Sequence, residues 1–78
     1  MKPKIIIFID WFYPAYKAGG PIKSVYNLIQ SLKGDFEFYI VTGDRDIDGQ
    51  RVDQPLDQWT EKDGYKVTYL SPEKQKSL

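Results

Sequence analysis

The chain of 78 residues contains no cysteine and no histidine, and each absence removes a class of chemistry. Without cysteine there can be no disulfide, thiolate metal site or cysteine nucleophile, and a cytoplasmic location is favoured. Without histidine the chain can supply neither an imidazole base nor a histidine metal ligand. We therefore expect no metal site and no cofactor among these residues.

The sequence also lacks an excess of either charge, because eleven basic residues balance eleven acidic ones. Broad electrostatic binding to nucleic acid or to an anionic membrane usually needs a basic excess, so we expect no nucleic-acid partner. The apolar run near the N-terminus, residues 5–9, is too short for a signal peptide or a membrane span. A soluble, cytoplasmic protein is the expectation.

The first half of the chain predicts a strand, a helix and a second strand. Residues 5–9 are apolar without alternation and rich in β-branched side chains, which is typical of a strand buried on both faces of a parallel sheet. Apolar residues at spacings of three and four predict a helix over 21–33, with Gly20 as its N-cap. Residues 36–42 predict the second strand, so a right-handed βαβ unit should span 4–42.

The second half of the chain is more polar. Residues 43–64 show no helical period and predict a long loop, with Trp59 as a hydrophobic anchor against the sheet. Alternation over 65–70 predicts a third strand at the edge of the sheet, wet on one side. Ser71 is the expected N-cap of a helix that starts over 72–78.

These elements predict an α/β fold, a Rossmann-like parallel sheet fragment, in one domain over residues 1–78. A parallel sheet whose first strand is buried on both sides needs helices on both sides. One full helix and the start of another do not supply them. We therefore expect an incomplete domain that is either a piece of a longer protein or completes itself by self-association through an open sheet edge.

An aromatic-proline loop, a glycine pair, regularly spaced apolar helix residues and a second strand ending in threonine form a recognisable opening. The residues are Phe12, Tyr13, Pro14, Gly19, Gly20, Val25, Leu28, Leu32 and 38–42. Over about residues 4–45 this opening resembles the N-terminus of a retaining GT-B-fold glycosyltransferase of the family-four-like, glycosyltransferase group 1 type.

The resemblance implies that the parent enzyme transfers a hexosyl-type sugar from a nucleotide-diphosphate sugar donor to a carbohydrate acceptor, as in polysaccharide biosynthesis. It also implies that the parent could associate peripherally with a membrane. In this family the residues that grip the nucleotide belong to the C-terminal domain. We therefore expect no catalytic residue in this chain and no activity of the chain by itself.

The loop between the first strand and the helix is the expected ligand site. Glycine lets the backbone approach a pyrophosphate closely, and the positive end of a helix follows at once. The resemblance implies that Gly19 and Gly20 lie next to the donor. Aromatic rings could stack on a sugar, an acid could accept from its hydroxyls, and cations could meet phosphate. The further expected donor- or substrate-binding residues are Asp10, Tyr13, Tyr16, Lys17 and Arg45.

Two other interpretations come from the same residues. Asp44, Asp46 and Asp48 before Gly49 are similar to the first half of a calcium loop, but Pro55 occupies the position of the bidentate glutamate, so no metal site is expected. The alternative to an enzyme is a non-catalytic α/β binding or interaction module that self-associates through its open sheet edge. A flavodoxin-like or receiver-like domain is disfavoured because neither a phosphate-binding serine or threonine loop nor an acid pair is evident.

Overall fold

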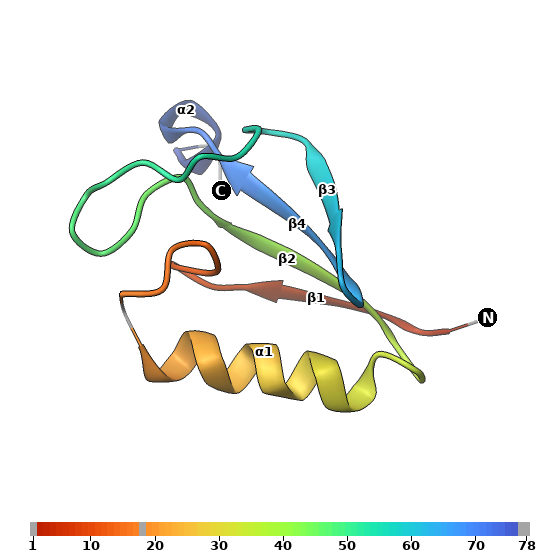
Figure 1. The fold of residues 1–78 in the computed structure, drawn as a ribbon. Helices are drawn as coiled ribbons and strands as arrows, with labels where there is room; N and C mark the ends of the chain where they lie inside the picture. The colour runs from red at the N-terminus through yellow and green to blue at the C-terminus, as the bar shows by residue number, and fades with distance from the viewer. Residues whose placement is uncertain (1, 18, 77–78) are drawn as a thin grey trace.

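Four strands and two helices make up the described part of the chain, residues 2–17 and 19–76 of a computed structural model. In chain order they are β1 (Lys4–Phe8), α1 (Gly20–Leu32), β2 (Glu37–Gly43), β3 (Trp59–Lys62), β4 (Tyr65–Leu70) and α2 (Pro72–Gln75). The strands form one mixed sheet in the order β1-β2-β4-β3. Figure 1 shows α1 running along one face of this sheet and α2 beyond the end of β4. The α/β class is confirmed.

The β1–α1–β2 unit is confirmed to within one residue at each end. The two strands pair in parallel, from Lys4 opposite Glu37 to Phe8 opposite Val41. The helix is capped one residue earlier than predicted, at Gly19, whose φ of 80° lies in the left-handed region that favours glycine. This unit places the loop after β1 at the carboxyl edge of the sheet.

The predicted long loop over 43–64 is wrong in its last part, because residues 59–62 form β3. This strand pairs antiparallel with β4 through a hairpin whose turn is Asp63-Gly64, with φ of 89° at the glycine. Asp-Gly is a strong hairpin-turn signal. With β3 outside it and β2 inside it, β4 is an interior strand, so the prediction of an edge strand over 65–70 is also wrong.

The α2 prediction is confirmed at its start. Ser71 is the N-cap, and its hydroxyl accepts from the Lys74 amide at 3.4 Å. The helix is described over Pro72–Gln75, and residues 77–78 of the predicted range lie outside the described residues.

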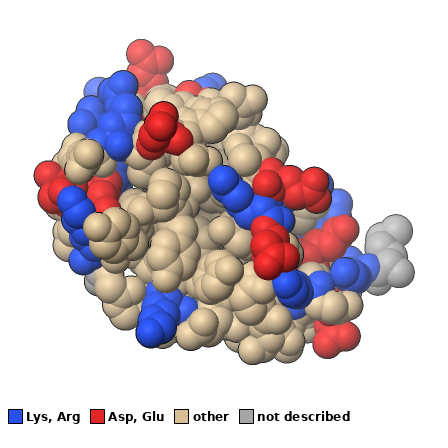
Figure 2. Space-filling view, in the orientation of Figure 1, with Lys and Arg blue, Asp and Glu red and all other residues tan. Residues whose placement is uncertain are grey.

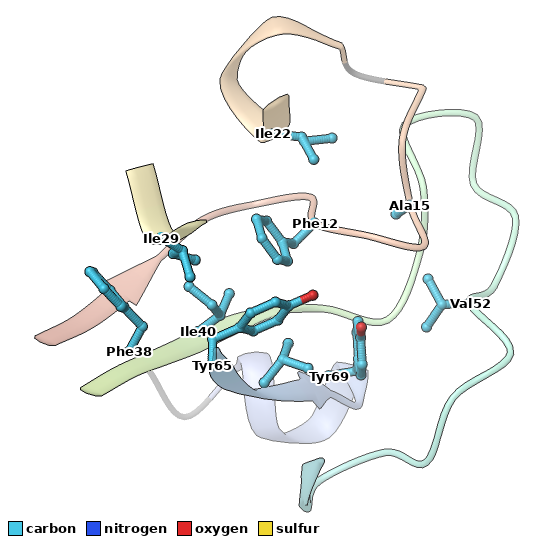
Figure 3. Packing of buried hydrophobic residues seen from close by; sticks show 10 residues of the cluster. Phe12, Ala15, Ile22, Ile29, Phe38, Ile40, Val52, Tyr65 and Tyr69 are labelled. Atoms are coloured by element: carbon cyan, nitrogen blue, oxygen red, sulfur yellow. The ribbon is translucent and has the colours of Figure 1, made fainter. Parts of the chain in front are cut away.

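One face of the sheet carries the core. Phe12, from the loop after β1, is fully buried between α1 and the sheet (Figure 3). The cluster around it consists of Ala15, Ile22, Ile29, Phe38, Ile40, Val52, Tyr65, Val67 and Tyr69. The loop after β1 therefore belongs to the core rather than lying over it as a flexible cover.

The opposite face has no covering helix among the described residues. Side chains alternate along each strand, and the pairing registers align them into rows. We call this the open face; it consists of Lys4, Ile6, Phe8, Glu37, Tyr39, Val41, Lys66, Thr68, Leu70, Trp59 and Glu61.

Ile6 is 59% exposed and Phe8 is 67% exposed, so the prediction that the first strand is buried on both faces is wrong. Trp59 packs edge-on against Tyr39 at 5.4 Å but is 51% exposed, which makes it a partial anchor.

The hairpin turn is fixed to the end of α1. Lys33 forms an ion pair with Asp63 at 3.1 Å, and the Gln30 side-chain amide donates to the Asp63 carbonyl at 2.9 Å. A Cβ atom on Gly64 would lie 2.5 Å from Cδ of Lys33. Glycine at this position satisfies both the turn and the close approach.

Candidate functional site

The carboxyl ends of β1, β2 and β4 meet at one edge of the sheet, and the loops that follow β1 and β2 lie there (Figure 1). Ligands of open α/β sheets bind at this edge. Three clefts are described at this edge. One of about 290 Å³ lies over the ends of β1, β2 and β4 and shares Asp10, Gly43 and Gln75 with the smaller of the other two. The larger of those two, about 480 Å³, lies between residues 14–17 and 50–54. The smaller, about 260 Å³, is lined by Asp10, Trp11, Gly43, Asp44, Arg45 and Gln75.

Aromatic packing fixes the loop after β1. The Tyr13 ring meets Tyr26 edge-on at 5.3 Å, and the Tyr13 carbonyl accepts a hydrogen bond from the Tyr69 hydroxyl. Burial raises the pKa of Tyr69 well above its ordinary range and that of Tyr65 to about 12. Both hydroxyls are therefore neutral at physiological pH, and the loop rests on uncharged, buried rings.

Asp46 joins the loop after β2 to the loop after β1. Its carboxylate, 8% exposed, accepts from the backbone amides of Lys17 at 3.2 Å and Ile47 at 2.7 Å. Gly49 closes the tight turn by donating to the Asp46 carbonyl at 2.9 Å, with φ of 86°. The edge of the larger cleft is therefore held by hydrogen bonds between two loops about thirty residues apart in sequence.

Lys17 and Asp48 form an ion pair at the same junction. The Lys17 ammonium lies 2.5 Å from the Asp48 carboxylate. This hydrogen bond lowers the pKa of Asp48 and raises the pKa of Lys17. The ammonium is therefore already neutralised by a carboxylate, which reduces what it can contribute to an incoming phosphate.

Asp44 is the functional candidate that sequence reasoning did not select. It lies directly after β2 and is only 2% exposed. Gln75 of α2 donates to its Oδ1 at 3.1 Å, while Oδ2 has no hydrogen-bond partner among the described residues. The nearest cationic group is Arg51, whose Nε lies 3.8 Å from Oδ2. An acid directly after the second strand was the available signal, but Asp44 was considered only as part of a calcium-like sequence whose match fails at Pro55.

The three aspartates of the calcium-like sequence have different partners, which are Gln75 and Arg51 for Asp44, two loop amides for Asp46 and Lys17 for Asp48. Among the described residues no group of three acids could hold a metal ion.

Four of the predicted site residues line the two clefts. Tyr16, 62% exposed, and Lys17 line the larger one, whereas Asp10 and Arg45 line the smaller. Arg45 also donates to the Gly49 carbonyl at 3.0 Å, so it helps to hold its own loop. Tyr13 lines neither cleft, because its ring is packed against other aromatic rings.

The predicted glycine pair lies at the start of α1, outside the lining of both clefts. The Gly19 amide donates to the Tyr16 carbonyl at 3.0 Å, and the Ile22 amide donates to the Gly19 carbonyl at 3.2 Å. Because proline has no N–H, Pro21 adds no donor, and Gly20 offers the remaining amide of this turn. A Cβ atom on either glycine would meet nothing within 4 Å, so no close contact within the described chain requires a glycine there. Donor binding by this pair stays a prediction.

The smaller cleft combines groups that suit a polyhydroxylated ligand. Carboxylates of Asp10 and Asp44 can accept hydrogen bonds, whereas Arg45 can donate them. The Gln75 amide nitrogen already donates to Asp44 and to the Leu70 carbonyl, which leaves its side-chain oxygen as an acceptor. Trp11 adds a flat apolar ring. On the face drawn in Figure 2, positive and negative side chains lie next to one another, as equal numbers of the two charges predict.

Comparisons with protein-family models, with curated proteins and with solved structures found no match to this chain. Within the described residues, no helix is both long and apolar enough to cross a membrane.

Proposed function

We propose that the chain forms the N-terminal, Rossmann-like part of a retaining GT-B-fold glycosyltransferase. The parent enzyme transfers a sugar from a nucleotide-diphosphate sugar to a carbohydrate acceptor and acts in the cytoplasm, with peripheral membrane association as a further part of the proposal. The observation that carries this proposal is the smaller cleft. There Asp10, after β1, and Arg45, after β2, face the same space at the carboxyl edge of a parallel strand pair.

The roles within this proposal follow from hydrogen-bonding capacity. Each sugar hydroxyl donates one hydrogen bond and accepts others, so it needs an acceptor and a donor nearby. Asp10 supplies acceptors and Arg45 supplies charged donors, while Trp11 offers an apolar surface to a sugar ring. This part of the enzyme supplies the cleft wall and preorganised charge around the departing phosphate, and no catalytic residue.

The test is nucleotide release by the protein from the whole gene, incubated with nucleotide-diphosphate sugars and carbohydrate acceptors. Asp10→Asn and Arg45→Gln should each lower kcat/KM by about tenfold to a hundredfold, the range for losing one charge-assisted hydrogen bond. Asp35→Asn, a change at an exposed carboxylate just after α1, is the matched control and should leave the rate unchanged. Unaltered rates in both cleft variants, or no nucleotide release with any donor, would contradict the proposal.

The second candidate is a non-catalytic α/β interaction module. The observation that favours it is the exposure of Ile6 and Phe8, 59% and 67%, on a sheet face that a monomer would normally cover. In this case neither nucleotide sugars nor sugars bind. Nucleotide release by the protein from the whole gene separates the two candidates, because the residues expected to bind the nucleotide lie outside this chain; an interaction module releases no nucleotide from any donor.

A further inference from the structure

The open face combines exposed apolar side chains with unpaired charges. Phe8 and Trp59, 67% and 51% exposed, lie in its carboxyl half together with Val41. Lys4, Glu37, Lys66 and Glu61 lie in its amino half, and no ion pair joins any of these four within the described chain.

Two of the unpaired charges are cations that share one ring. The ammonium groups of Lys4 and Lys66 lie 5.9 Å and 5.5 Å from the centroid of Tyr39. A cation over a ring is attracted by about 0.5–1 kcal/mol at an exposed site, but two like charges at one ring repel each other. Carboxylates brought to this end of the face would offset that repulsion.

The sign of the charges alternates across the sheet. Following the strand order, the amino half presents Lys4 on β1, Glu37 on β2, Lys66 on β4 and Glu61 on β3. Consider a two-fold axis that runs parallel to the strands, just outside the open face and midway between β2 and β4. This axis would place β1 over the partner's β3 and β2 over the partner's β4. Each strand that carries a positive residue then faces one that carries a negative residue. Lys4 and Glu37 share one row of the sheet and Lys66 and Glu61 lie in the next, so the facing charges are displaced by two residues along the strands.

The same axis matches the apolar half of the face. Phe8 and Trp59 share a level in the sheet, because both align with the row of Val41 and Thr68. Reversing the strand order therefore brings Phe8 opposite the partner's Trp59, on both sides of the interface. We infer that the open face is the contact surface of a symmetric homodimer, in which two sheets pack face to face with their strands aligned.

The required area is within reach of this face. A standard interface buries about 800 Å² on each partner, roughly a sixth of the 5137 Å² surface of this chain. Phe8, Tyr39 and Trp59 would supply roughly 300 Å² of it, taking half of the 150–250 Å² that an aromatic side chain buries. The remaining open-face residues contribute the rest. The inference concerns the chain of 78 residues alone; in the proposed transferase, further elements of the parent enzyme would cover this face instead.

The first test is the mass of the 78-residue chain by sedimentation equilibrium between about 1 and 500 µM. We expect a concentration-dependent rise from the 9.1 kDa monomer to twice that mass. Phe8→Glu should weaken dimerisation at least tenfold. Leu28→Glu, at a side chain of α1 that is 48% exposed, is the matched control and should leave it unchanged. Circular dichroism checks that both variants are folded, which their surface positions favour.

The second test uses charge reversal, which separates this dimer from non-specific aggregation. The variants Lys4→Glu/Lys66→Glu and Glu37→Lys/Glu61→Lys should each dimerise at least tenfold more weakly than the unaltered chain. Mixed in equal amounts they should form a heterodimer, because opposite charges again face each other. The inference would be overturned by a monomer at every concentration. It would also be overturned if Phe8→Glu still dimerised, as a dimer paired at a strand edge would, or if the two charge-reversed variants did not dimerise when mixed.

Discussion

Both faces of the sheet carry aromatic and aliphatic side chains, but their environments are opposite, and most of the charged strand residues lie on the open face. Phe8 and Phe12 show the contrast within four residues: the first is 67% exposed on the open face, and the second is fully buried under α1. The difference does not lie in the residue type. It lies in what covers each face, because in the described chain α1 and the loop after β1 both lie on the same side of the sheet and leave the other side open. Burial of an apolar strand is therefore decided by what covers it.

The largest expected effect compares these two phenylalanines directly. Phe12→Ala removes a side chain from the centre of the core and should lower the free energy of unfolding by about 3–5 kcal/mol. A domain of this size is stable by roughly 4–12 kcal/mol, so this variant should lose between about a quarter and all of its stability. Phe8→Ala should change stability by less than about 0.5 kcal/mol. Urea denaturation at submicromolar concentration, where association does not contribute, measures both; equal losses would remove the contrast between the faces.

An intermediate effect is expected at alkaline pH. The buried Tyr65 on the covered face has its pKa raised to about 12, while in the unfolded chain it titrates near its ordinary value of 10. Its contribution to stability is therefore complete below pH 10 and is lost as pH rises from 10 towards 12, by about 3 kcal/mol at 1.4 kcal/mol per unit. Thermal unfolding measured across this range should show the loss. Tyr65→Phe should reduce this loss, with the part that comes from the buried Tyr69 remaining, whereas Tyr16→Phe at an exposed ring is the control.

The smallest effect is a gain in stability. Thr42 lies on the covered face, 4% exposed, and its hydroxyl has no hydrogen-bond partner among the described residues. Thr42→Val keeps the β-branched shape and removes the unpaired group, so the free energy of unfolding should rise by roughly 1 kcal/mol. Thr68→Val, equally buried but on the open face, should change it less. A loss of stability in Thr42→Val would show that this hydroxyl has a partner in solution.

The sequence predicted the positions of helices and strands best where several local signals define the same element. The first strand, the helix and the second strand were found to within one residue because apolar periodicity and glycine-proline signals define each of them. β3 was missed because Trp59–Lys62 is only four residues long and three of the four are polar, although the Asp63-Gly64 turn after it is typical of a hairpin. Sheet order followed from that omission: without β3, β4 was assigned to the edge.

The site was predicted in part for a similar reason. Position after a parallel strand identified Asp10 and Arg45, since the carboxyl edge collects such residues whatever the details of the loop. Tyr13 lies outside both clefts because an aromatic side chain in a loop can turn inwards as well as outwards, and here its ring packs against Tyr26. The burial of Asp44 depends on Gln75, about thirty residues away, and a pattern of neighbours in sequence does not reveal such a contact.

The glycine at the tip of the β3–β4 hairpin couples local unfolding of β3 to local unfolding of the end of α1. Because Gly64 lies against the Lys33 side chain, and Asp63 is bonded to both Gln30 and Lys33, the hairpin tip is fastened to the tail of α1. Fraying of the outermost strand and loosening of the helix end should thus be one event. Although β3 lies at the edge of the sheet, its hairpin turn thus helps to hold α1 against the sheet.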